Sequence, residues 1–316
     1  MASPISSRRV LAVSLLVDLL DVVTNLVVAW LTGSAVIFAE MAQGIADAAG
    51  SALLVIGERR AARPGDAQHP FGYAREAFFW GLLSAVAMLV IGGGLSGWRG
   101  YQQLVAPEPL ESPLLAIGVL VLAVITNGYA VSLSARKLLV RGVGFRRAFH
   151  DSGRPLVKGA LLRDAVGTFT SVVGLVALLF YQGLGVVAFD AAGAIAAAFL
   201  MLAASLALMA QLRGLITGRS LPERELERVG EAIRATPGVV GVNRLAAIYS
   251  GATRVLIDAD LDLAQDFDTP RIEATLDDLE RRVRSVLPDT GRVRVLLNSP
   301  QPSSTRGEGS VRGGNA

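Results

Sequence analysis

Acidic and amide side chains stand inside long apolar stretches of this 316-residue sequence, where they could bind a cation. Gln43 and Asp47 lie in the second apolar stretch, and their spacing of four residues puts both on one face of a helix. Asp18 and Asp21 lie in the first stretch and Asp164 in the fifth. A carboxylate at mid-bilayer depth is disfavoured by about 3 kcal/mol, so these groups should face a cavity, an ion or a partner charge.

Acids on three different stretches at similar depth predict a cluster of carboxylates that converges inside a helix bundle. Such a cluster requires a cation or protons, and its simplest occupant is a divalent metal that exchanges for protons. Two structural interpretations stay open. Gln43 and Asp47 can form a packed pair that joins helices. Arg163 can reach the aqueous surface, or it can turn inward, pair with Asp18 or Asp21 and neutralise part of the cluster.

The composition is that of a membrane protein, with 52% hydrophobic residues and a mean hydropathy of +0.49. The absence of cysteine excludes disulfides, thiolate metal sites and cysteine nucleophiles. The net charge is only +3, and the basic residues are scattered over loops without aromatic partners, which argues against nucleic-acid binding. We expect neither enzymatic activity nor a resident cofactor.

Six segments are long enough to cross a bilayer, which takes about 20 apolar residues each. They run over 9–31, 34–56, 77–99, 113–135, 157–181 and 186–212. Lys and Arg gather on one side of these segments, so the positive-inside rule places both termini in the cytoplasm. The sequence predicts an α-helical membrane protein with a cytoplasmic N-terminus at 1–8 and a six-helix transport domain over 9–219.

The last hundred residues have a different character, because charges become frequent and the long apolar runs stop. Helices are expected over 222–234 and 269–286, and strands over 239–249, 254–263 and 292–297. This predicts a small cytoplasmic α+β domain (αββαβ) over 220–298, followed by a disordered tail at 299–316. Asp258, Asp260 and Asp262 alternate with apolar residues in the second strand, which is more typical of a solvated face than of an ion site.

The loop over 63–73 contains a second pair of potential metal ligands, Asp66 and His69. A site with two ligands on the protein surface is one interpretation of this pair. A loop histidine that only satisfies local hydrogen bonds is the other.

These features together resemble the cation diffusion facilitator family. The matching residues are Thr32-Gly33-Ser34 before the second segment, the Gln43-x3-Asp47 spacing, and the loop Pro64-Gly65-Asp66-Ala67-Gln68-His69-Pro70-Phe71-Gly72. The order of six helices followed by the αββαβ domain fits as well. The stretch over 158–165 looks closest to the branch of the family that contains a mitochondrial zinc transporter.

The resemblance implies export of a divalent metal across the cytoplasmic (inner) membrane in exchange for protons, by a homodimer held through a ferredoxin-like cytoplasmic domain. Zinc comes first, with manganese, iron or cobalt as alternatives. The implied metal ligands are Gln43, Asp47 and Asp164, with Asp18, Asp21, Asp66 and His69 as auxiliary ligands.

The sequence also departs from the family pattern. Arg163 and Gly167 stand where the fifth helix should supply ligands, and Tyr73 replaces a second loop histidine. The remaining ligands are all oxygen, which suits manganese, magnesium or iron better than zinc. Two other functions therefore stay open: a membrane scaffold or partner subunit that keeps the carrier fold without transporting metal, and proton-coupled export of an organic cation.

Overall fold

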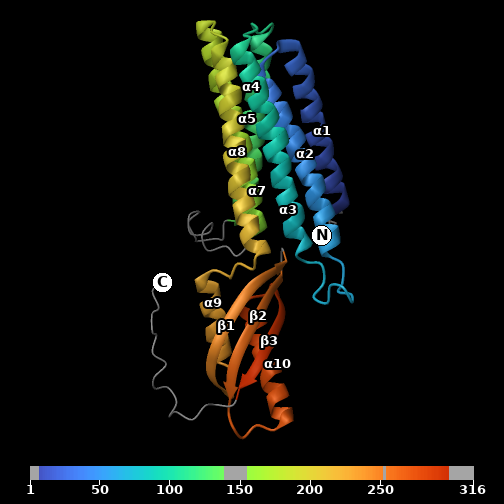
Figure 1. Ribbon diagram of the computed structural model, residues 1–316, viewed down its shortest axis with the longest axis vertical. Helices are drawn as coiled ribbons and strands as arrows, with labels where there is room; N and C mark the ends of the chain where they lie inside the picture. Colours follow the sequence, from blue (N-terminus) through green and yellow to red (C-terminus); the bar gives the residue numbers. More distant parts are fainter. Residues whose placement is uncertain (1–6, 139–154, 252–253, 299–316) are drawn as a thin grey trace, which may run out of the picture. The chain divides into compact units, whose positions relative to one another are not determined.

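The computed structural model describes residues 7–138, 155–251 and 254–298, and side chains from Leu19 onward except at 134, 136–160, 252–253 and 298. The predicted disordered tail at 299–316 lies outside the described residues. The chain divides into two compact units, Met1–Gly218 and Arg219–Ala316. The described part of the first unit is helical, and that of the second combines helices with a three-stranded sheet (Figure 1).

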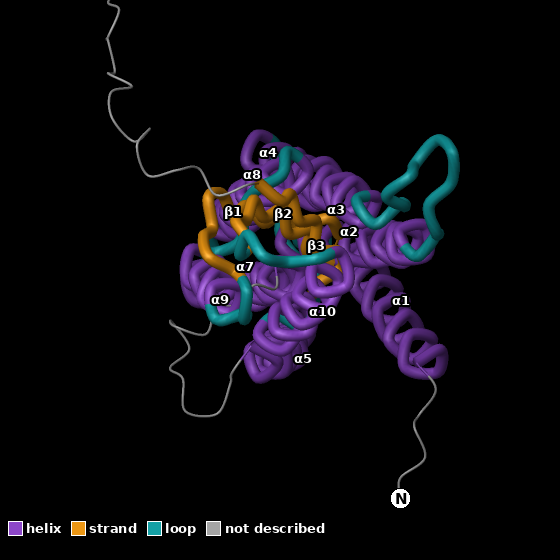
Figure 2. The backbone as a smooth tube through the Cα atoms, turned by 90° about the horizontal axis from the view of Figure 1, so that it is seen from below, coloured by secondary structure: helices purple, strands orange, loops and turns teal. Residues whose placement is uncertain are grey.

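The helices of the first unit pack around α2. In chain order they are α1 (Ser7–Thr32), α2 (Ala35–Ala61), α3 (Glu76–Ala87), the π-helix η1 (Met88–Leu95), α4 (Ser96–Val105), α5 (Pro113–Leu138), α7 (Pro155–Leu184) and α8 (Ala188–Ile216). Helix α2 packs against α1, α3, η1, α4, α7 and α8. Figure 2, which looks along the bundle, shows α1 and α5 on its margin.

Four helical stretches in the described part of the chain are long and apolar enough to cross a membrane, and we conclude that the protein is a multi-pass membrane protein. They are Glu76–Val105, Pro113–Leu133, Leu161–Leu184 and Ala188–Ile216. The described apolar part of α1, Leu19–Thr32, is shorter. Helix α2 is long enough but falls outside this set. It carries Glu40, Gln43 and Asp47, which lower its hydropathy, and this polarity is tolerated because α2 lies among other helices.

One helical span is longer than the sequence suggests. The segment expected over 77–99 is part of a continuous helical run through α3, η1 and α4 that ends at Val105. The added turns pack on α8, where a Cβ at Gly100 would lie 2.8 Å from a side-chain carbon of Ile195. Gln103 is buried, and its Nε2 donates to the Glu108 carbonyl oxygen at 2.8 Å, which joins this end of the helix to the segment that follows it.

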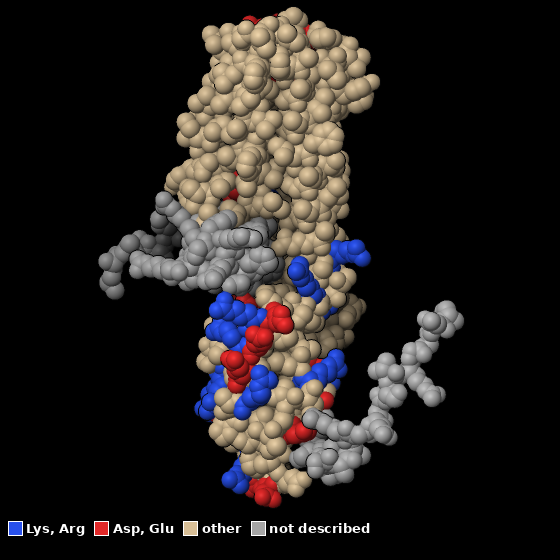
Figure 3. All heavy atoms as spheres, turned by 90° about the vertical axis from the view of Figure 1, so that its left-hand side faces the viewer, with Lys and Arg blue, Asp and Glu red and all other residues tan. Residues whose placement is uncertain are grey.

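Small residues let the membrane helices approach closely. A Cβ at Gly174 of α7 would lie 2.5 Å from Val36 of α2, and one at Gly193 of α8 would lie 2.7 Å from the same side chain. Three helices therefore meet at Val36 with almost no intervening space. The outward face of the unit drawn in Figure 3 is nearly free of charged side chains, as contact with lipid requires.

The second unit contains α9 (Glu223–Arg234), β1 (Val239–Gly251), β2 (Arg254–Leu263), α10 (Thr269–Val286) and β3 (Thr290–Asn298). The strand order is β1-β2-β3, with β1 antiparallel and β3 parallel to β2. Parallel strands need a crossover, which α10 supplies. Asp268 begins that helix, because its side chain accepts from the Arg271 amide at 3.1 Å.

Strand β2 has one apolar and one acidic face. The buried side chains of the apolar face are at most 7% exposed: Val255, Ile257, Ala259, Leu261 and Leu263. Two half-buried acids of the opposite face have cross-strand partners. Asp262 accepts from Asn243 Nδ2 at 2.9 Å, and Asp258 Oδ1 lies 3.8 Å from Arg294 Nε.

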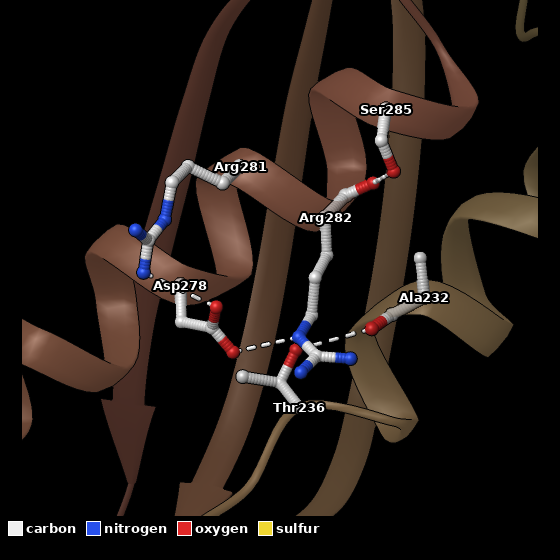
Figure 4. Close-up of polar contacts among 6 residues, drawn as sticks. All are labelled: Ala232, Thr236, Asp278, Arg281, Arg282 and Ser285. Carbon is white, nitrogen blue, oxygen red and sulfur yellow. Dashed lines mark hydrogen bonds and ion pairs between the residues drawn. The ribbon is translucent and has the colours of Figure 1, made fainter.

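Helix α10 packs against α9 and carries a local charge network on its surface. Asp278 accepts from Arg282 Nε at 2.6 Å and from Arg281 Nη2 at 3.2 Å (Figure 4). The hydrogen bond from Arg282 lowers the pKa of the Asp278 carboxyl group. Such networks stabilise an exposed helix modestly and indicate no site.

Candidate functional site

The start of α2 is held by an acid from α8. Asp190 is fully buried and accepts from Ser34 Oγ at 2.6 Å, from the Ala35 amide at 2.7 Å and from the Val36 amide at 3.2 Å. Ser34 also caps its own helix by accepting from the Ile37 amide at 3.3 Å. The amide groups at a helix N-terminus favour a negative charge, so Asp190 has a structural partner and fixes where α2 begins.

One face of α2 carries the polar residues of the apolar bundle. Glu40, Gln43 and Asp47 are spaced by three and four residues, which aligns their side chains along the helix. Glu40 and Gln43 are buried, whereas the Asp47 side chain is 34% exposed. This face of α2 is in contact with α7.

Gln43 lies against a glycine of α7. Its Oε1 accepts from Thr170 Oγ1 at 2.6 Å, and a Cβ at Gly167 would lie 2.8 Å from its Nε2. Gly167 therefore makes room for the Gln43 amide. Ser171, one residue beyond Thr170, accepts from Asn127 Nδ2 of α5 at 3.0 Å. A layer of uncharged polar groups thus joins α2, α5 and α7.

Asp47 of α2 lies opposite Arg163 of α7, which precedes Gly167 by one helical turn. Arg163 Nε is 3.9 Å from Asp47 Oδ1, and Arg163 Nη2 donates to Ser84 Oγ of α3 at 3.1 Å. The Arg163 side chain is only 17% exposed and Ser84 is buried. A Cβ at Gly50 would lie 2.6 Å from Ser84 Oγ and 3.7 Å from Arg163 Nη1. Arg163 thus turns inward, toward Asp47, whereas the inward alternative predicted from the sequence names Asp18 or Asp21.

Glu40, which is not among the metal ligands predicted from the sequence, lies beside this layer of polar groups. Glu40 is buried and shares a side-chain hydrogen bond with Ser171. Its carboxyl group also interacts electrostatically with Asp21 and Asp47. Its spacing from Gln43 and Asp47 is the signal that could have identified it. Thr170, three residues after Gly167 on α7, could have been identified in the same way.

The other predicted acids are distributed around this layer. Asp164 follows Arg163 and is half-buried, while its backbone oxygen accepts from Thr168 Oγ1 at 3.1 Å. Asp21 of α1 accepts from Asn25 Nδ2 at 3.1 Å and lies near α2, 3.8 Å from where a Cβ at Gly44 would be. The side chain of Asp18 lies outside the described residues.

The described side chains include no group of three or more His, Cys, Asp or Glu residues that could hold a metal ion. Asn25 is buried, and its Oδ1 has no hydrogen-bond partner in the described part of the chain. A buried acceptor without a donor is costly, so the neighbourhood of Asp21 and Asn25 suits a cation or a bound water.

The loop between α2 and α3 is organised by Asp66. Its Oδ1 accepts from the amides of Gln68 at 2.9 Å and His69 at 2.7 Å, and its Oδ2 accepts from Tyr73 Oη at 2.7 Å. The His69 ring lies against Tyr73 with centroids 4.2 Å apart and the ring planes tilted by 35°, and its Nδ1 is 3.8 Å from Asp66 Oδ1. Both carboxylate oxygens therefore have local donors, and the surface metal site at Asp66 and His69 stays a prediction.

The fold and this polar layer define the class of protein: a multi-pass membrane protein with polar residues inside its bundle and a separate α/β unit after the last span. The sequence model of the cation efflux transmembrane domain matches residues 11–212, and that of the cation efflux protein cytoplasmic domain matches residues 221–295. The chain belongs to the cation diffusion facilitator family.

Individual relatives are distant. The chain is 28% identical over 243 residues to the proton-coupled zinc antiporter SLC30A9, mitochondrial, of Xenopus laevis, which covers 74% of this chain and 43% of that protein. Its human counterpart is 26% identical over 239 residues, covering 74% and 42%. The cation-efflux pump FieF of Cronobacter sakazakii is 29% identical over 292 residues, covering 89% of each chain. The chain thus spans less than half the length of the SLC30A9 relatives, and the likeness to them supports a place near their branch.

Proposed function

We propose that this protein carries a divalent metal cation across a membrane in exchange for protons. The observation that supports this most is the polar face of α2, where Glu40, Gln43 and Asp47 lie inside an apolar bundle against α7. Hydrocarbon disfavours such groups unless they have a function or a partner. The relatives named for zinc antiport and cation efflux support the same substrate class.

In this proposal Asp47 is the principal ligand and the proton acceptor. Asp164 is the second ligand, and Gln43 supplies a neutral oxygen after its hydrogen bond from Thr170 is released. Asp21, with Asp18, has an auxiliary role, which the unpartnered Oδ1 of Asn25 supports. Because a carboxylate must lose its proton to bind a metal, metal entry releases protons and couples the two fluxes.

The proposed membrane arrangement has six crossings with both termini in the cytoplasm, in the cytoplasmic membrane. Alternating access is a rocking of helix groups about the site. The αββαβ domain, ferredoxin-like in this proposal, holds a homodimer, which the match of residues 221–295 to the cytoplasmic domain of cation efflux proteins supports. Zinc is the first candidate substrate, and the all-oxygen ligand set keeps manganese, iron and cobalt as alternatives.

The direct test is metal-driven proton movement in liposomes that contain the purified protein. Asp47→Asn keeps the shape of the side chain but removes its charge and its proton, so it should abolish proton movement on addition of Zn²⁺ or Mn²⁺. Glu111→Gln is the matched control, because it also neutralises an acid but at an exposed position between α4 and α5. Equal fluxes for wild type and Asp47→Asn would remove Asp47 from the mechanism.

A second candidate function is a membrane scaffold or partner subunit that keeps the carrier fold without transporting metal. The contacts of Arg163 with Asp47 and of Thr170 with Gln43 favour it, because both potential ligands already have partners within the protein. Calorimetry on the purified protein discriminates between the two functions. Absence of binding for Zn²⁺, Mn²⁺, Fe²⁺ and Co²⁺ supports the scaffold, and micromolar binding that is lost in Asp47→Asn and Asp164→Asn supports the carrier.

A further inference from the structure

Arg163 places a permanent positive charge beside the acid that the proposed carrier would use for its metal. Its Nε lies 3.9 Å from Asp47 Oδ1, and the side chains of Arg163 and Asp47 are 17% and 34% exposed. A guanidinium group stays protonated in proteins, so Arg163 cannot leave Asp47 by losing its proton. It can leave only by moving.

The same side chain has a second contact that defines where it can go. Arg163 Nη2 donates to Ser84 Oγ of α3 at 3.1 Å, which is a hydrogen bond, whereas 3.9 Å to Asp47 is longer than a charge-assisted hydrogen bond. Gly50 keeps the space between α2, α3 and α7 open, since a Cβ there would lie 2.6 Å from Ser84 Oγ. The guanidinium is thus anchored on Ser84 and only loosely paired with Asp47.

A divalent metal at Asp47 and the Arg163 guanidinium repel each other, so the two cannot share this carboxylate at close range. We propose that Arg163 is a resident counter-cation, which neutralises Asp47 in the unloaded carrier and moves away from Asp47 when the metal enters, while its existing hydrogen bond to Ser84 holds it. This inference rests on the proposed carrier function. It makes Arg163 a specificity-determining residue, because a weakly held cation is excluded and only a strongly coordinated dication displaces the arginine.

The proposal predicts that Arg163→Gln and Ser84→Ala change the affinity for metal in opposite directions. Arg163→Gln keeps a hydrogen-bond donor but removes the competing charge, so Zn²⁺ should bind about tenfold more tightly or better. Ser84→Ala leaves the charge but removes the hydroxyl that holds the guanidinium away from Asp47, so Zn²⁺ should bind about threefold more weakly. In the double variant no arginine is left for the residue at position 84 to hold, so the affinity should equal that of Arg163→Gln.

The measurement is calorimetric titration of the purified full-length protein with Zn²⁺, and in parallel with Mn²⁺, at neutral pH. Asp47→Asn in the wild-type and Arg163→Gln backgrounds shows whether the bound metal is the one at Asp47. Thermal unfolding without metal checks that each variant is folded. Should Arg163→Gln fail to fold, Arg163→Lys replaces it. Arg163→Lys keeps the positive charge, so this variant should bind metal as wild type does. If Arg163 acted only through its hydrogen bonds, the affinity of Arg163→Lys for metal would differ from that of wild type.

The outcomes separate this inference from the function on which it rests. Tighter metal binding in Arg163→Gln together with weaker binding in Ser84→Ala supports the counter-cation role. Metal binding at Asp47 that is seen in Arg163→Gln but not in wild type supports it as well. Wild-type binding that depends on Asp47 but is unchanged or weakened in Arg163→Gln overturns this inference alone. Absence of binding in wild type and in Arg163→Gln overturns the carrier function, and the counter-cation with it.

Discussion

Ser34 and Asp190 stand 156 positions apart in the chain and meet in a buried hydrogen bond of 2.6 Å. Ser34 is the N-cap of α2 and Asp190 lies in the first turn of α8. Because the carboxylate also accepts from the amides of Ala35 and Val36, it holds the first turn of the helix that carries the candidate site. The depth of Gln43 and Asp47 therefore depends on an acid that takes no part in the proposed chemistry.

Replacing this acid should destabilise the membrane unit. Asp190→Asn retains one acceptor oxygen for three donors and loses the charge, so the free energy of unfolding should fall by about 1–3 kcal/mol. Thermal unfolding in detergent measures this effect. Glu111→Gln neutralises an exposed acid and should leave the unfolding temperature unchanged. An Asp190→Asn protein as stable as the wild type would show that the cap does not hold α2.

Two glycines of α7 should respond to alanine in opposite ways. A Cβ at Gly167 would lie 2.8 Å from Gln43 Nε2, so Gly167→Ala must displace Gln43 and weaken its bond from Thr170. We expect a loss of about 1–3 kcal/mol from overpacking. Gly183 has open space around its Cβ position, and Gly183→Ala should gain up to about 1 kcal/mol from helix propensity. Thermal unfolding of the two variants compares them, and a stable Gly167→Ala protein would contradict the close contact.

The loop between α2 and α3 should keep its order in mild acid. The hydrogen bond from Tyr73, followed by that from the His69 amide, lowers the pKa of Asp66 below its ordinary value of 3.8. A lowered pKa stabilises the folded loop above pH 3.8, and this contribution is lost as the pH falls through the lower value.

Tyr73→Phe removes the hydrogen bond that lowers the pKa of Asp66 most, so this pKa should rise toward 3.8. An NMR titration of protein carrying ¹³C-labelled aspartate measures the change. Gln68→Ala is the control, since Gln68 contributes only its backbone amide. Identical titrations of Asp66 in wild type and Tyr73→Phe would exclude the tyrosine as its main partner.

Tyr249 of β1 should report on the core of the second unit at high pH. Burial, reinforced by the charge of Glu225, raises its pKa from 10.0 to about 12. The folded state therefore binds this proton more tightly than the unfolded state. The stabilisation is complete below pH 10 and is lost as the pH rises toward about 12.

An ultraviolet titration of tyrosinate, taken as the difference between wild type and Tyr249→Phe, isolates this group. The expected difference curve has its midpoint near 12. In denaturant, where burial is removed, the midpoint should return to 10. A native midpoint near 10 would show that Tyr249 is open to solvent.

Many features of this protein follow from local sequence alone. Apolar length determines where α7 and α8 lie, and the alternation in β2 identifies its buried face, because helix and strand periods act on neighbouring residues. The spacing of Gln43 and Asp47 was sufficient to place both on one face of α2, which carries the candidate site. The end of the α4 span was not predictable, because it depends on how Gly100 packs against Ile195 of another helix.

The partners of the buried polar groups were decided only by the tertiary structure. From the sequence, Arg163 could turn outward or inward, and nothing in its neighbours shows that it lies between Asp47 and Ser84. The same holds for Gly167, whose missing side chain makes room for Gln43. Each of these contacts joins residues that are far apart in the chain, so it depends on how helices rotate and pack against one another. Local periodicity sets the face of a helix, and only packing sets what that face meets.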